Sequence, residues 1–169
     1  DALIGRGEVM RAMGRLAEAV SDYDTALLFA PDRFEAVFLR AAALHALGHH
    51  DQAIAGYDHA LAIRPDDPST LHNRAIVESE LYRFENALAG FRRLAAIDAS
   101  YPHALGNVAY FGAHLCDWRE RTDLVAAIEA GVRGGKDVCA PLTFLSISPD
   151  AASQLRCARI HVAERHRYT

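Results

Sequence analysis

The sequence predicts an all-α solenoid of antiparallel helix pairs, followed by an amphipathic helix at the C-terminal end. Residues recur with a period of 34, turn-forming residues divide each period into two halves, and apolar residues within each half follow helical spacing. The 169 residues are 51% hydrophobic and 24% charged, which is enough apolar character to bury a core. A helical repeat array therefore explains the composition and the pattern together.

Identical residues recur in the first two periods at the same positions. The matched pairs are Gly14 and Gly48, Ala19 and Ala53, Tyr23 and Tyr57, Ala26 and Ala60, Leu27 and Leu61, and Pro31 and Pro65. The third period keeps an aromatic residue at Phe91 and an alanine at Ala87, but it has Tyr82 and Ala99 where Gly48 and Pro65 stand.

Each period reads as two helices. In the second period, Asp32 is predicted to cap a helix over residues 33–46, which Gly48 ends because glycine accepts the left-handed conformation. Asp51 then opens a helix to residue 64, and Pro65 stops it. The third period begins with Asp67 and Pro68, a cap followed by proline at the first helical position.

This pattern resembles the tetratricopeptide repeat. The family's signature residues occur as Gly7, Gly14, Leu16, Ala19, Tyr23, Ala26 and Pro31, then as Ala41, Gly48, Ala53, Tyr57, Ala60 and Pro65, and more loosely as Ala75, Phe84, Ala87 and Phe91. The resemblance implies three repeats within residues 1–99, at about 1–33, 34–67 and 68–101.

A degenerate fourth helical pair is predicted over residues 102–135. Pro102 starts a helix through residue 114, Cys116-Asp117-Trp118 forms a turn, and a helix over 123–132 ends at Gly134-Gly135. Residues 136–169 then form an irregular apolar-rich linker and a last helix, for which Ser148 is the expected N-cap and Pro149 the first residue.

The last helix carries an apolar stripe of Ala151, Leu155, Ala158 and Val162, which must be buried somewhere. Docking onto the fourth pair through Leu124 and Ile128 is the expected solution, with self-association through this helix or fraying as alternatives.

The tail also resembles the junction between the repeats and the catalytic half in O-linked N-acetylglucosamine transferase-like proteins, especially their bacterial relatives. The carrying motifs are Leu115-Cys116-Asp117-Trp118, Ala140-Pro141-Leu142, Ser148-Pro149-Asp150 and residues 154–159. The resemblance implies a glycosyltransferase fragment that presents protein substrates to an absent catalytic half. Because no catalytic residue of that family lies in the matched region, this chain itself is not expected to be an enzyme or to hold a cofactor.

In such arrays the first helix of each pair lines a concave groove that suits an extended peptide. The predicted groove residues are Phe38, His45, His72, Asn73, Asn107 and Tyr110. Asn73 and Asn107 are 34 residues apart, and an asparagine amide can hold a peptide unit through a donor and an acceptor. The alternative is that both asparagines bond to a neighbouring helix.

Other candidate sites have plainer explanations. Arg6, Arg40 and Arg74 share one register, and their heads are expected to reach water or a carboxylate rather than an anionic peptide. The first inner helix offers Ile4 and Glu8, which does not suit a clamp for a chaperone's terminal carboxylate. His45 and His49 are not expected to hold a metal ion, because Gly48 separates them and no carboxylate or cysteine completes the set.

The expected function is protein or peptide binding. A net charge of −4 argues against a nucleic-acid partner, and the longest apolar runs are too short to cross a membrane. The odd number of cysteines without C-x-x-C spacing suits free, packed thiols in a reducing cytoplasm. The alternative to a glycosyltransferase-linked module is a non-enzymatic scaffold or adaptor for assembling protein complexes.

Overall fold

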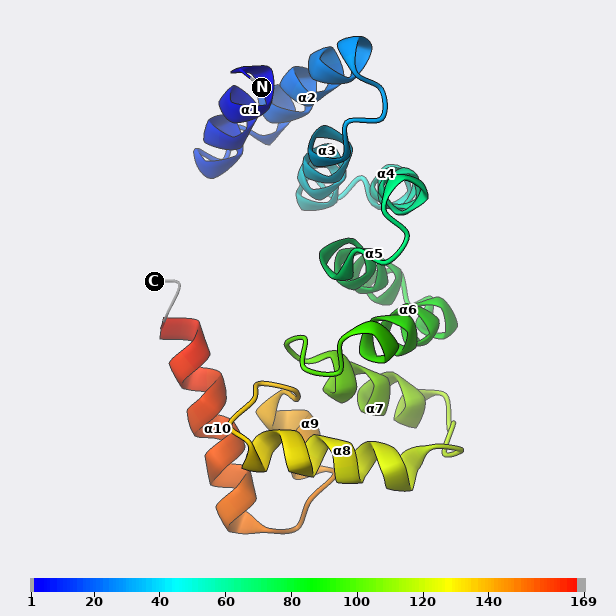
Figure 1. Cartoon of the computed structure of the whole chain (residues 1–169), viewed down its shortest axis with the longest axis vertical. Coiled ribbons are helices and arrows are strands. Elements are labelled where there is room, and N and C mark those ends of the chain that lie inside the picture. The colour runs from blue at the N-terminus through cyan, green and yellow to red at the C-terminus, as the bar shows by residue number, and fades with distance from the viewer. Residues whose placement is uncertain (1, 167–169) are drawn as a thin grey trace. The chain divides into compact units, whose positions relative to one another are not determined.

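The computed structural model describes residues 2–166, and these residues form ten α-helices and no strand (Figure 1). The helices are α1 (Ala2–Ala12), α2 (Leu16–Phe29), α3 (Phe34–Ala46), α4 (His50–Ile63), α5 (Pro68–Glu80), α6 (Phe84–Ile97), α7 (Ala104–His114), α8 (Arg121–Arg133), α9 (Pro141–Leu145) and α10 (Ala151–His166). None of the helices in the described part combines the length and the apolar character needed to cross a bilayer.

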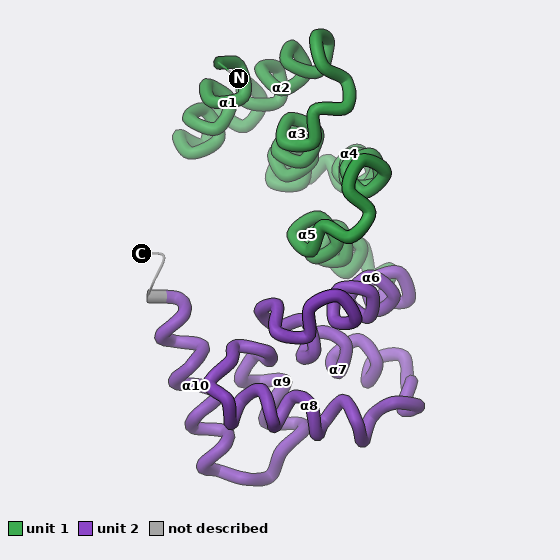
Figure 2. The backbone as a smooth tube through the Cα atoms, viewed as in Figure 1, with its two compact units in different colours: residues 1–83 green, residues 84–169 purple. Residues whose placement is uncertain are grey.

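The chain divides into two compact units, unit 1 over residues 1–83 and unit 2 over residues 84–169 (Figure 2). Unit 1 holds helices α1 to α5, and unit 2 holds helices α6 to α10. The division falls between α5 and α6, inside the predicted third repeat.

In unit 1, each helix packs against the next along the chain, from α1 to α5. Tyr23 and Tyr57, which share one position of the repeat, are both fully buried. Small residues let the helices approach closely: a Cβ added to Gly7 would meet the Tyr23 ring at 2.6 Å, and one added to Gly56 would meet the Ala41 Cβ at 2.8 Å. The aromatic ring thus fills the space that the small residue leaves, as the spacing predicted.

The first helix of each pair ends in the same hydrogen-bonded turn. Residues 14, 48, 82 and 116 follow the 34-residue period, and all four have a positive φ, namely 74°, 79°, 58° and 53°. After α3, the Gly48 N–H donates to the His45 carbonyl and the His49 N–H to the Leu44 carbonyl, each at 2.9 Å. This is the Schellman arrangement, and the same pair of bonds closes the turns at the other three positions.

Of the five helix starts predicted from a capping residue or a proline, one is right and four are wrong. Asp67 is the N-cap of α5, where its carboxylate accepts from the Thr70 N–H at 2.8 Å. Asp32 does not cap α3: the N-cap is Arg33, without a side-chain bond, while the Asp32 carboxylate lies 3.0 Å from His59 Nε2. Helix α4 begins at His50, one residue before Asp51.

The other two corrections fall in unit 2. Helix α7 begins at Ala104, because His103 at its N-cap is left-handed and Pro102 lies in the preceding turn. Helix α10 begins at Ala151, and its cap is Asp150, whose carboxylate accepts from the Ser153 N–H at 2.9 Å. Ser148 is instead buried, and its carbonyl accepts from the Gln154 side chain.

Unit 2 packs α7 against α6, α8 and α9, and α10 against α8 and α9. One core joins these elements, with Leu105, Ile128, Val132, Val138, Cys139, Phe144 and Cys157 buried and Leu124 and Ile160 packed against them. The segment that was predicted to be irregular contains the short helix α9, so it forms part of this core.

The terminal helix docks within unit 2, but through a different face from the one predicted. Leu155 and Val162 are 53% and 54% exposed, so the predicted stripe is not the buried face. Cys157 and Ile160 enter the core that contains Ile128. The polar end of the sequence at residues 167–169 lies outside the described residues.

Tyr57→Ala should destabilise unit 1 by about 3–5 kcal/mol, since truncating a buried aromatic leaves a cavity that the array fills poorly. Tyr57 packs in one cluster with Ala41, Ile54 and Val77. Urea unfolding followed by far-UV circular dichroism measures the loss, with the exposed Phe29→Ala as the control. A Tyr57→Ala chain that unfolds like the parent would contradict this packing.

Tyr82→Gly should stabilise the chain by about 0.5–1 kcal/mol, because a side chain at a left-handed residue carries a steric cost that exceeds the unfolded-state entropy glycine adds. The tyrosine side chain is 81% exposed, so little packing is lost. Tyr82→Ala is the matched control, since it removes the ring and keeps the Cβ. Equal melting temperatures for the glycine and alanine variants would contradict the proposed strain.

Candidate functional site

The predicted groove residues of unit 1 are engaged within the unit to different degrees. Phe38 is partly buried, with its ring centroid 6.0 Å from that of Phe34 and 6.1 Å from that of Tyr57. His45 bonds through Nε2 to the Glu80 carboxylate at 2.8 Å. His72 is half-buried on α5 beside Asn73. Phe38 is therefore mainly a packing residue.

Asn73 lies next to the buried hydroxyl of Tyr57. Burial raises the pKa of Tyr57 to about 12, and the neighbouring Asn73 amide acts in the opposite direction. The hydroxyl nevertheless completes no hydrogen bond of good geometry. This contact between α5 and α4 agrees with the alternative considered for the asparagine, namely an interaction with a neighbouring helix.

In unit 2, Asn107, Tyr110 and His114 share one face of α7, at positions i, i+3 and i+7. The Asn107 side chain is half-buried. Within the described residues, its side-chain amide makes no hydrogen bond, while its backbone N–H donates to the His103 carbonyl. Tyr110 is exposed, and its ring centroid is 4.3 Å from that of His114. Asn73 and Asn107 thus occupy the same repeat position with different surroundings.

A cavity of about 320 Å³ opens beside this face of α7, within unit 2. Helices α7, α8 and α9 and the turn between α7 and α8 line it, with Tyr110, His114, Trp118, Leu124 and Leu142 among its apolar and aromatic walls. Trp118 is half-exposed, and the Arg121 guanidinium lies 4.9 Å from its ring. The walls are thus mostly apolar, with charged groups at the edge.

Asp117 is a largely buried charged residue that lines this cavity. Its carboxylate accepts from Arg119 Nη2 at 2.7 Å and from Arg92 Nη2 at 3.1 Å. These two guanidinium groups, Arg119 first, lower the pKa of Asp117 well below its usual value. Asp117 is therefore ionised at neutral pH and fixes the turn of the Cys116-Asp117-Trp118 motif.

The three arginines that share one register are all paired with aspartates. Arg40 Nε bonds to Asp24, Arg74 Nε bonds to Asp58 at 2.6 Å, and Arg6 Nε bonds to Asp22 at 2.7 Å. The pairs of Arg40 and Arg74 join the first helix of one repeat to the second helix of the preceding one. The prediction that these heads reach a carboxylate is therefore correct.

The three cysteines are unbridged, with Cys139 and Cys157 buried and Cys116 exposed. Burial raises the pKa of Cys139 to about 12 and also raises that of Cys157. Both buried thiols are thus protonated core residues.

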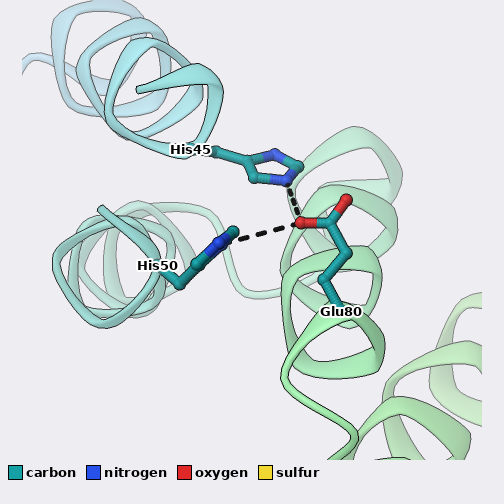
Figure 3. Close-up of side chains that lie close together, drawn as sticks. All are labelled: His45, His50 and Glu80. Carbon is teal, nitrogen blue, oxygen red and sulfur yellow. Dashed lines mark hydrogen bonds and ion pairs between the residues drawn. The ribbon is translucent and has the colours of Figure 1, made fainter. Parts of the chain in front are cut away.

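Two clusters of histidine and carboxylate side chains were missed by the sequence reasoning. In the first, His45 of α3 and His50 of α4 face Glu80 of α5 (Figure 3). The sequence pattern paired His45 with His49 and predicted no carboxylate beside them, so both points are corrected. In the second, His103 and His161 face Asp137. Glu80 lies 35 residues after His45, so only the stacking of successive repeats could have suggested the first cluster; no periodic signal marks the second.

Comparisons with known proteins agree with the fold. Residues 10–73 match the family model of the tetratricopeptide repeat. A structure of MamA from Desulfovibrio magneticus RS-1 is similar with a TM-score of 0.69 at 15% identity, covering 78% of this chain and 75% of that chain. No curated protein sequence matches the chain.

Two further structures are similar over 68% of this chain at 18% identity. The first repeat domain of Spaghetti (RPAP3), bound to the HSP90 peptide SRMEEVD, has a TM-score of 0.65 over 91% of its length. The Sgt2 repeat domain from Aspergillus fumigatus has a TM-score of 0.62 over 78% of its length. The predicted fold class, an all-α solenoid of tetratricopeptide repeats, is thereby confirmed.

Proposed function

We propose that this tetratricopeptide-repeat chain binds an extended peptide segment of a partner protein, with α7 of unit 2 as its main contact. The observation that carries the proposal is the open apolar cavity lined by Tyr110 and His114, which share one face of α7 with Asn107. An extended peptide needs partners for its backbone and pockets for its side chains. The Asn107 side chain can bond to the peptide backbone, and the cavity can receive a peptide side chain.

Asn107 is the residue we expect to hold the peptide backbone, because its amide has no bond inside the described part of the chain. Tyr110 and Trp118 supply aromatic surface with a polar edge, which is typical of interaction sites. The RPAP3 structure bound to an HSP90 peptide supports this class of ligand for the fold.

For unit 1 taken by itself, we propose a second, weaker peptide contact at His72 and Asn73, since both are half-buried on α5. His45 and Phe38 support the surface by packing and by the bond to Glu80. A clamp for a peptide's terminal carboxylate is not part of the proposal, because Arg6, Arg40 and Arg74 are already paired with aspartates.

Asn107→Ala should weaken peptide binding about 2- to 12-fold, the value of one hydrogen bond, while the melting temperature stays unchanged. A peptide selected from a displayed random library against the 169-residue chain serves as the probe, and fluorescence anisotropy gives its dissociation constant. Tyr110→Ala should weaken the same complex by removing apolar contact. Asn86→Ala, an exposed asparagine of α6 in the same unit, is the matched control.

Two results would count against this site. Unchanged affinity in both the Asn107 and Tyr110 variants would place the peptide elsewhere. A large loss of stability with unchanged affinity would favour a structural role for the α7 face.

A finer proposal is that the module presents protein substrates to a glycosyltransferase, and it rests on the sequence resemblance alone. None of the similar structures described above adds support to it, and Asp117 of the Cys-Asp-Trp motif has a structural role in its turn. The plain scaffold or adaptor is the alternative, which the repeat fold supports equally.

Reading the complete coding sequence around this chain separates these two proposals. If a glycosyltransferase half exists, it should lie directly after residue 169 and begin with a β-strand. The chain alone should not bind UDP-N-acetylglucosamine in calorimetry. A stoichiometric micromolar site would show that the nucleotide-sugar site lies within these 169 residues.

A further inference from the structure

The cluster of His103, Asp137 and His161 brings together three separate segments of unit 2. His103 is the N-cap residue of α7, Asp137 lies in the connection between α8 and α9, and His161 is on α10. We propose that these three side chains form a binding site for a zinc ion or a similar divalent transition metal.

The spacing of the ligand atoms suits such an ion. His103 Nε2 lies 3.4 Å from Asp137 Oδ2, and His161 Nδ1 lies 3.6 Å from Asp137 Oδ1. Zinc binds nitrogen and oxygen ligands at about 2.0–2.2 Å, so two ligands of a tetrahedral ion stand about 3.4 Å apart. The two imidazole rings are 5.2 Å apart between centroids and edge to face, so both can turn a nitrogen to the carboxylate.

The Asp137 carboxylate is largely buried, and one of its two oxygens lacks a hydrogen bond. Asp137 is only 10% exposed in its side chain, and its Oδ1 makes no hydrogen bond. His161 Nδ1 opposite is also buried and without a bond. Buried polar atoms that face each other without bonding are costly, and a shared cation would satisfy both.

The backbone holds the first two residues together. The His103 N–H donates to the Asp137 carbonyl and the Gly106 N–H to the Val138 carbonyl, each at 2.9 Å. His103 has a φ of 60°, a conformation that costs free energy in residues other than glycine and that is concentrated at functional sites. The strained residue is thus one of the three proposed ligands.

The cluster opens onto a cavity within unit 2. A cavity of about 510 Å³ is lined by all three residues and by Lys136, Glu164 and Arg165. It leaves room for a water or an anion as the fourth ligand, as in zinc sites with an open position.

The cluster of His45, His50 and Glu80 in unit 1 provides an internal comparison (Figure 3). There, Glu80 is 46% exposed and already accepts a hydrogen bond from His45 Nε2 at 2.8 Å. A hydrogen bond and water satisfy that carboxylate, so it does not require a cation. The two clusters have the same kinds of ligand and differ in burial and bonding.

Zinc titration by calorimetry on the whole 169-residue chain tests the proposal, together with Co²⁺ titration read by the visible absorption of four-coordinate cobalt. The expected result is one site in unit 2, whose occupation raises the melting temperature. Asp137→Asn and His161→Gln should each weaken metal binding at this site by at least about 10-fold. Glu80→Gln is the matched control and should leave it intact.

Circular dichroism of each variant without metal checks that it is folded, and His161→Gln, at a side chain that is 21% exposed, replaces the less buried of these two ligands. If metal binding is absent, or survives both Asp137→Asn and His161→Gln, the proposal is wrong. If the chain binds one ion and Glu80→Gln abolishes that binding, the ion lies in unit 1 and the proposal is also wrong. If two ions bind and the Asp137 variant keeps only one, the proposal is supported.

Discussion

The left-handed residue that follows the first helix of each pair is the constraint on which the rest of the packing depends. It occurs at residues 14, 48, 82 and 116 and reverses the chain through the same two hydrogen bonds each time. Within a unit, this turn sets the direction in which the second helix of a pair leaves the first. Tyr23 then meets Gly7, and Tyr57 packs in the cluster that holds Ala41, without further adjustment.

The same constraint explains why the arginine–aspartate pairs repeat. Arg40 with Asp24 and Arg74 with Asp58 have the same separation of 16 residues, so one register serves two junctions between repeats. Such half-exposed pairs contribute little free energy individually, about 0–1 kcal/mol. They act mainly by giving long arginine side chains a defined position, which removes these basic groups from the surface available to a peptide.

The periodic part of the fold could be predicted from the sequence, and the non-periodic part could not. Helix pairing, the glycine turns and the burial of Tyr57 follow from residues that lie close in the chain and recur. The helix starts predicted at Asp32 and Asp51 are wrong because the N-caps are Arg33 and His49 instead, and neither makes a side-chain cap bond. The buried face of α10 was wrong for a deeper reason: its contacts, through Cys157 and Ile160, are with residues far away in the sequence.

Glycines in unit 2 show why such contacts escape a sequence reading. A Cβ on Gly106 would lie 2.7 Å from the Cys139 backbone, and one on Gly131 would lie 2.7 Å from the Val138 side chain. Because these two positions lack a side chain, the segment after α8 packs closely against α7 and α8. Asp137 therefore lies beside His103. Nothing in a 34-residue period marks them, and the same holds for the histidine–carboxylate clusters.

Asn73 and Asn107 occupy the same position of the repeat but have different surroundings. Both occupy one position of the period, but the tyrosine that Asn73 contacts, Tyr57, is replaced 34 residues later by Phe91, which has no hydroxyl. Phe91 stacks on Phe111 instead, with ring centroids 5.5 Å apart. Asn107 has no such hydroxyl beside it, and this difference is the reason for our proposal that a peptide contacts α7.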